Sequence, residues 1–119
     1  MAPEILLKKP YNAFSVDVWA LGITLFIMLA LELPFDFRDQ QAAIKKMVAK
    51  DWKLPPEKIK APPSKKLSAV LSGMIEPEWT KRLTMPKLLT NSWLADSYKK
   101  AQAKVNEKWY IWLKQKKTP

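Results

Sequence analysis

The 119-residue sequence contains no cysteine and no histidine. Without cysteine, these residues can form no disulfide bond, thiolate zinc site or cysteine nucleophile. Without histidine, the commonest general base and metal ligand are missing. Only two glycines are present, which is too few for a glycine-rich phosphate loop. Catalysis would therefore depend on carboxylates, lysines or tyrosines, and the eleven acidic residues are scattered among 21 basic ones.

Positive charge is in excess, with a formal net charge of +10. A basic surface attracts nucleic-acid phosphate. Here, however, the lysines come in scattered pairs between apolar residues, and no nucleic-acid-binding signature accompanies them, so we expect no such partner. The N-terminal residues do not resemble a signal peptide, because they contain the acidic Glu4 and the apolar run Ile5–Leu7 is too short for the apolar core of one. We therefore expect a cytoplasmic location, with the nucleus as the alternative.

One long apolar run organises the chain. The fourteen residues between Asp17 and Glu32 carry no formal charge, and almost all are apolar. The run is too short to cross a bilayer, which takes roughly 20 helical residues, and too long for an ordinary strand. Because apolar side chains would point in every direction around this helix, we expect protein to bury it on all sides.

The remaining pattern predicts an all-α fold with no convincing strand. We expect a short helix over Ala2–Leu7, then a central helix capped by Ser15, with Asp17 in its first turn and its end at Pro34–Asp36. Further helices are expected over 38–50, from Ser64 to Ile75, from Thr84 to about Leu94 and over 95–113; the proline-rich segment 52–63 should be an extended loop.

Apolar periodicity also predicts which faces of these helices are buried. The helix over 38–50 should turn the following residues inward: Ala42 or Ala43, Ile44, Met47 and Val48. The helix after Ser64 should bury Leu67, Val70 or Leu71, Met74 and Ile75.

Five short motifs, in order along the chain, resemble the C-terminal lobe of a eukaryotic protein kinase. They are similar to the A-P-E, D-x-W-x-x-G, L-P-F, K-R-L-T and H-P-W-L elements of that family. Their residues are Ala2, Pro3, Glu4, Asp17, Trp19, Gly22, Pro34, Phe35, Arg82 and Trp93. The resemblance implies that residues 1–94 are a partial kinase domain, a helical C-lobe around one central buried helix, truncated on its N-terminal side.

The resemblance also implies roles for individual residues. Glu4 and Arg82 would form a buried ion pair that tethers the activation segment; the alternative is two surface residues that never meet. Asp17 would accept hydrogen bonds from catalytic-loop amides, or act only on the helix dipole. Trp19 and Trp93 would be packing residues. The motifs look closest to the calmodulin-dependent-kinase-like group. Three short stretches resemble testis-specific serine/threonine kinases: Pro10–Asn12, Leu25–Leu29 and Ile44–Met47.

The function implied by the resemblance belongs to a parent protein. That parent would use ATP and Mg²⁺ to phosphorylate protein serine or threonine, but the glycine-rich loop, the H-R-D loop and the D-F-G metal site precede the A-P-E motif. We therefore expect no catalytic, cofactor-binding or metal-binding residue here, and a chain that is catalytically incompetent alone. A non-catalytic, pseudokinase-type binding module and a degenerate product without function are the alternatives.

The sequence also departs from the kinase pattern at Leu31, which occupies a position where the family usually has glycine.

The segment 95–119 is expected to be a basic amphipathic helix. Its apolar residues recur at three- and four-residue steps, and its seven lysines against two acidic residues leave a net charge of +5. The anchors Val105, Trp109 and Trp112 resemble those of calmodulin targets and of membrane-surface helices. Three interpretations stay open: docking of the tryptophans on the helical lobe, a calmodulin-type or autoregulatory partner, and membrane contact, which we expect least. Protein substrates or regulators complete the expected partners.

Overall fold

The computed structural model describes residues 1–59 and 64–117, and these form helices without a strand. The helices are α1 (Pro3–Leu6), α2 (Ala13–Ala30), α3 (Gln40–Val48), α4 (Lys65–Met74), α5 (Met85–Leu89) and α6 (Ala95–Lys117). The expected all-α class is confirmed for the described part of the chain. The segment 52–59 contains no helix, as expected, whereas the rest of the predicted loop, 60–63, lies outside the described residues.

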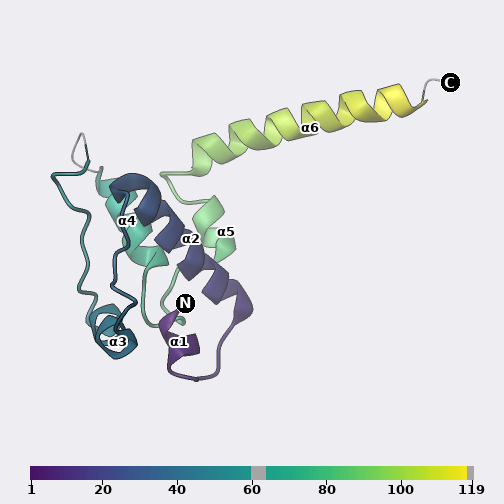
Figure 1. The fold of residues 1–119 in the computed structure, drawn as a ribbon. Helices are drawn as coiled ribbons and strands as arrows, with labels where there is room; N and C mark the ends of the chain where they lie inside the picture. Colours follow the sequence, from purple (N-terminus) through teal and green to yellow (C-terminus); the bar gives the residue numbers. More distant parts are fainter. Residues whose placement is uncertain (60–63, 118–119) are drawn as a thin grey trace.

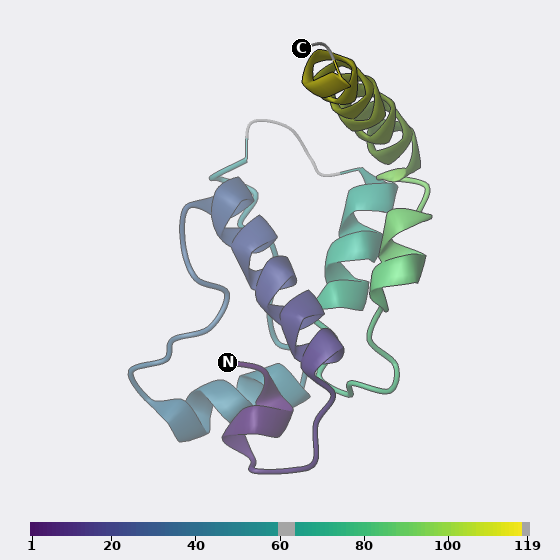
Figure 2. The same cartoon turned by 90° about the vertical axis from the view of Figure 1, so that its right-hand side faces the viewer.

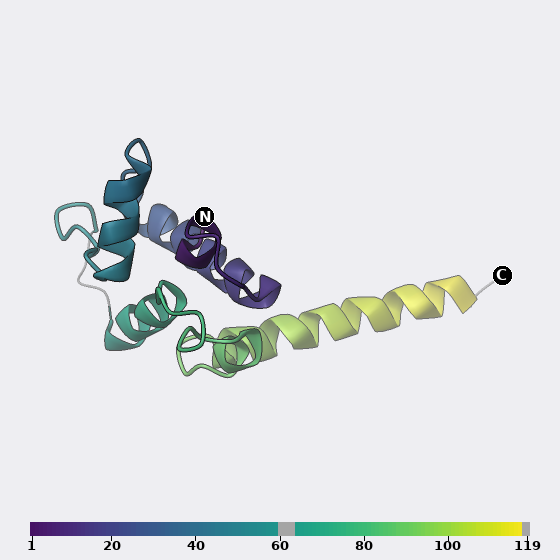
Figure 3. The ribbon, with the colours of Figure 1, turned by 90° about the horizontal axis from the view of Figure 1, so that it is seen from below.

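Helix α2 lies at the centre of the arrangement (Figure 1). Helix α4 packs against it, while α1 packs against α3 beside the N-terminal end of α2. Helices α4 and α5 run side by side in Figure 2. Helix α6 leads away from the other five, which is clearest in Figure 3, and gives the molecule its long dimension of 62 Å.

Helix α2 begins earlier than the sequence suggested. The Asn12 carboxamide oxygen accepts hydrogen bonds from the backbone N–H groups of Phe14 (2.9 Å) and Ser15 (3.2 Å), so Asn12 is the N-cap. The prediction of Ser15 as the cap was wrong, and Asp17 lies beyond the first turn of α2. Asn12 lies three residues before Ser15 and accepts from the free N–H groups at the helix end, so the helix starts at Ala13.

Within the described residues only one face of α2 is buried, so these residues alone do not provide the expected burial on all sides. Val18, Trp19, Gly22, Phe26 and Ala30 are buried. The buried residues clustered with them come mainly from α4, from Met47 in α3 and from Phe35 in the loop after α2. Apolar residues on the opposite face are open to solvent: Phe14 (77%), Leu21 (45%) and Met28 (72%). No described element covers that side.

The 18 residues of α2 are also long and apolar enough, by length and composition alone, to cross a membrane, so the length argument against it fails. The core packing of its buried face marks it as a core helix.

Glycine at position 22 permits the close packing of α2 on α4. A Cβ atom at Gly22 would lie 2.8 Å from the Cβ of Met74 and 3.1 Å from the Cγ1 of Ile75. Real Cβ atoms do not approach one another that closely. The glycine of the D-x-W-x-x-G element therefore has a steric reason in this chain.

The two other predicted caps, Ser64 and Thr84, are confirmed. Ser64 accepts from the N–H of Leu67 (3.1 Å), and Thr84 accepts from the N–H of Lys87 (3.4 Å). Helix α5, however, ends at Leu89 and not near Leu94. The Asn91 side chain accepts from the N–H of Trp93 (2.9 Å) and forms a local turn that competes with the helix.

Burial in α3 and α4 follows most of the predicted pattern. In α3, Ala43 and Met47 are buried, and Ile44 is half-buried. Val48 is 56% exposed, so its inward assignment was wrong; it lies at the last turn, where α3 leaves the core. In α4 both candidates at the alternative position, Val70 and Leu71, are buried, together with Met74 and the following Ile75.

Helix α2 ends at Ala30, before the predicted Pro34–Asp36. Leu31 caps it in the left-handed region, with φ of 57°, and donates its N–H to Ile27 O (2.8 Å). Its side chain is 85% exposed, so it gains little from packing. Glycine is the usual residue in this conformation because a Cβ atom is strained there.

We predict that Leu31→Gly stabilises the chain by about 0.5–1 kcal/mol, because relief of left-handed strain outweighs the entropy of a glycine in the unfolded state. Urea unfolding followed by circular dichroism would measure this. The control is Leu33→Gly, an exposed residue without positive φ, which should destabilise. A lower midpoint for Leu31→Gly would contradict the prediction.

Candidate functional site

The Arg82 guanidinium is the centre of the candidate site, and its side chain is fully buried. Nη1 donates to Glu4 Oε1 (2.7 Å) and Nη2 donates to Glu4 Oε2 (3.0 Å), which gives a two-pronged ion pair with a carboxylate 4% exposed. The predicted buried pair between Glu4 and Arg82 is confirmed, and the alternative of two separate surface residues is wrong.

Backbone carbonyls take up the remaining donors of Arg82. Nε donates to Glu76 O (2.8 Å), Nη1 to Ser15 O (2.9 Å) and Nη2 to Pro77 O (3.4 Å). All five N–H groups of the guanidinium therefore have an acceptor. Arg82 connects α1, the first turn of α2 and the loop between α4 and α5. Sequence reasoning found the carboxylate partner but not these carbonyls, because a backbone acceptor has no residue-type signature.

An aromatic layer lies beside the arginine. The guanidinium carbon is 5.1 Å from the centre of the Trp19 ring, and the Trp19 ring is stacked on Phe35 with centroids 6.2 Å apart. Trp19 is 1% exposed, and its Nε1 has no hydrogen-bond partner among the described residues. Trp19 is thus a packing residue, as predicted, and Phe35 of the L-P-F motif is its partner.

The structure brings several motif residues together and leaves others apart. Ala2, Trp19 and Phe35 share one buried cluster next to the ion pair. Trp93 is half-buried against a second cluster that contains Val18 and Leu88. Asp17 is exposed, and its carboxylate has no hydrogen bond or ion pair within the described residues. The role that the resemblance implies for Asp17 stays a prediction.

Arg38, the other arginine of the chain, forms a similar ion pair at the surface. It forms a two-pronged pair with Asp36 (2.7 Å), and the side chains are 91% and 57% exposed. The hydrogen bonds from Arg38 lower the pKa of Asp36 from its usual 3.8 to about 2. An exposed pair of this kind contributes little to folding, because water screens it.

The tail residues lie apart from this site. Val105, Trp109 and Trp112 are 63%, 59% and 45% exposed on α6. The two tryptophan rings stack on each other, with centroids 4.9 Å apart. The interpretation in which they dock on the helical lobe is therefore wrong for this structure.

Comparisons with known proteins agree with this geometry. The protein kinase domain family matches residues 1–94. The chain belongs to the protein kinase family. It is 35% identical over 99 residues to CBL-interacting serine/threonine-protein kinase 12 of Arabidopsis thaliana, a match that covers 83% of this chain and 19% of that protein. It is 30% identical over 96 residues to probable serine/threonine-protein kinase MARK-A of Dictyostelium discoideum, covering 81% of this chain and 9% of that protein.

The chain thus spans about a fifth or less of the length of these curated kinase relatives. They are consistent with the calmodulin-dependent-kinase-like group named from the motifs. The closer likeness to testis-specific kinases is unconfirmed and stays a prediction.

We predict that Arg82→Lys destabilises the kinase chain by about 2–4 kcal/mol, because a single ammonium group cannot reach the acceptors that the planar guanidinium serves. Unfolding in urea would measure the loss. The matched control is Arg38→Lys, which should change stability by less than about 0.5–1 kcal/mol since that pair is exposed. Equal effects of the two substitutions would contradict the assigned role of Arg82.

Proposed function

We propose that this chain is the helical C-lobe portion of a serine/threonine protein kinase, whose whole protein transfers the γ-phosphate of ATP to protein serine or threonine. The observation that carries the proposal is the buried ion pair between two motif positions 78 residues apart. The names of the relatives favour a kinase over a non-catalytic binding module.

ATP and Mg²⁺ enter this proposal only through the whole protein. No three histidine, cysteine, aspartate or glutamate side chains gather into a metal site within residues 1–59 and 64–117. The chain also has no glycine-rich loop and no histidine for an H-R-D motif. These residues do not fit an Mg-ATP site, so we propose that groups outside the 119 residues supply it. Protein substrates or regulators are the proposed partners, in the cytoplasm or, alternatively, the nucleus.

We predict that the purified chain incorporates no phosphate into a basic protein substrate from radiolabelled ATP and Mg²⁺. The positive control is full-length CBL-interacting serine/threonine-protein kinase 12 in the same assay. Phosphate transfer by the chain itself would contradict the proposal.

A chimera sharpens this assay. The segment of the control kinase that aligns with residues 1–94 is replaced by those residues, and the chimera should keep activity. A folded but inactive chimera would instead support the non-catalytic module.

We further propose that α6 is a recognition helix for an acidic, calmodulin-type regulator. Five consecutive apolar residues, 109–113, are between 38% and 59% exposed. They point to all sides of the helix, which suits a partner that encloses a helix more than a flat membrane surface. The net charge of +5 over 95–119 favours an acidic partner.

We predict that Ca²⁺-loaded calmodulin, used as the probe, shifts the tryptophan emission of the chain to shorter wavelength, and that EGTA reverses the shift. The double variant Trp109→Ala/Trp112→Ala should lose the response, because the two rings are the exposed reporters. Vesicles of anionic phospholipid are the comparison. A shift with vesicles and none with calmodulin would favour the membrane interpretation and contradict this proposal.

A further inference from the structure

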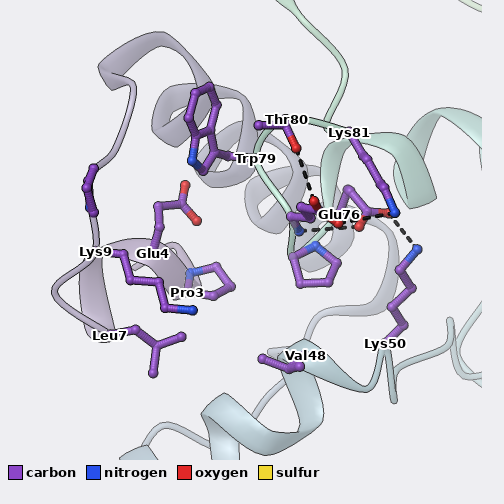
Figure 4. A pocket seen from close by; sticks show the side chains of 13 residues that line it. Pro3, Glu4, Leu7, Lys9, Val48, Lys50, Glu76, Trp79, Thr80 and Lys81 are labelled. Atoms are coloured by element: carbon purple, nitrogen blue, oxygen red, sulfur yellow. Dashed lines mark hydrogen bonds and ion pairs between the residues drawn. The ribbon is translucent and has the colours of Figure 1, made fainter.

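A cavity of about 600 Å³ lies on the side of the molecule where α1 and α3 end. Its walls come from three segments: α1 and the residues after it, the C-terminal end of α3, and the loop 76–81. In Figure 4, Leu7 and Lys9 lie across the cavity from Lys50 and Glu76, with Val48 below. This volume has room for one or two large side chains of a peptide.

The floor of the cavity is held in place by the buried arginine. Glu4, Glu76 and Pro77 line the cavity, and each accepts a hydrogen bond from Arg82 through its carboxylate or backbone carbonyl. The cavity therefore exists before any partner binds. Pre-formed pockets lose less entropy on binding than flexible ones.

The walls are largely apolar. Pro3, Pro10 and Pro77 contribute no backbone N–H donor, and Trp79 adds an aromatic surface. Leu7 (39%) and Val48 (56%) are exposed at the opening. Val48, which the apolar pattern placed in the core, therefore presents an exposed apolar group at the cavity. Such walls suit a large apolar side chain.

The rim carries an excess of one positive charge, on Lys9, once Arg82 is counted against Glu4. Internal partners neutralise the carboxylates of the cavity: Arg82 pairs with Glu4, Lys50 with Glu76 (2.6 Å) and Lys81 with Glu78 (3.2 Å). The ammonium of Lys9 has no ion pair or hydrogen bond within the described residues, and neither has that of the adjacent Lys8. Lys50 and Lys81 are themselves 54% and 70% exposed, so a further carboxylate can reach them.

Backbone strain also occurs on both sides of this rim. Lys8 (φ 54°) and Lys50 (φ 55°) adopt left-handed conformations, each just after the end of a helix. The following N–H groups close the helix ends, from Lys9 to Glu4 O and from Asp51 to Lys46 O, both at 2.9 Å. Glycine is the common residue at such positions. A lysine at such a position costs strain. Lys50 places a cation at the cavity, whereas Lys8 only adjoins the lining residue Lys9.

We propose that this cavity docks an acidic peptide segment of a protein partner, which inserts one large apolar side chain flanked by carboxylates. Charge complementarity with the lysine rim selects this occupant. A second copy of the chain is a poor occupant, because the chain carries +10 and its own exposed apolar run, 109–113, is flanked by lysines. The inference does not depend on phosphotransfer.

The test is fluorescence anisotropy with the full chain and a labelled peptide that has one phenylalanine with two aspartates on each side. Two comparison peptides replace the phenylalanine by serine, or the aspartates by lysines. We expect the acidic phenylalanine peptide to bind with a dissociation constant of about 1–100 µM, and about tenfold or more tightly than either comparison peptide. Equal binding of the serine peptide, or no binding at about 1 mM, would overturn the proposal.

Variants of the chain locate the binding. Lys9→Glu and Val48→Glu should each weaken binding about tenfold or more. The matched controls are Lys45→Glu on α3 and Leu33→Glu, both exposed and outside the cavity, which should stay within about twofold. All four positions are solvent-exposed, and thermal melts verify that the variants fold. An equal loss for Lys9→Glu and Lys45→Glu would show non-specific attraction and overturn the proposal.

Discussion

The buried ion pair between Glu4 and Arg82 is the interaction on which the rest of this structure depends. Removing two charges from water is costly, and the cost is offset only when every donor finds an acceptor. Here the guanidinium meets a carboxylate and three backbone carbonyls, with the Trp19 ring beside it. Loss of one partner would leave the other charged and buried, at a cost of about 3–5 kcal/mol.

The Arg82 side chain connects segments that are far apart in the sequence. It connects α1, the first turn of α2 and the loop 76–77, so it fixes both the N-terminal end of the central helix and the floor of the cavity. Gly22 completes the arrangement two turns further along α2, where it lets α4 approach. The other face of α2, with Phe14, Leu21 and Met28, has no described element against it.

Local chemistry made part of this fold predictable. Ser64 and Thr84 cap the helices that follow them because a hydroxyl can reach the free N–H groups whatever the tertiary context. The Glu4 and Arg82 pair was predicted from the family resemblance, since no local pattern connects residues so distant. Other predictions were wrong because a neighbouring side chain gave a competing local signal. Asn12, not Ser15, caps α2, and the turn at Asn91 ends α5 before Leu94. The exposure of Val48 and of one face of α2 depends on which elements pack nearby. The apolar periodicity of a single helix carries no information about those neighbours.

A double-mutant cycle tests the central claim most directly. Glu4→Gln, Arg82→Lys and the double variant would be unfolded in urea, and their free energies of unfolding compared with that of the unchanged chain. Direct pairing predicts that the double variant loses less than the sum of the two single losses, with a coupling of about 2–3 kcal/mol. Additive losses would contradict it, because they would mean that the two side chains stabilise the fold independently.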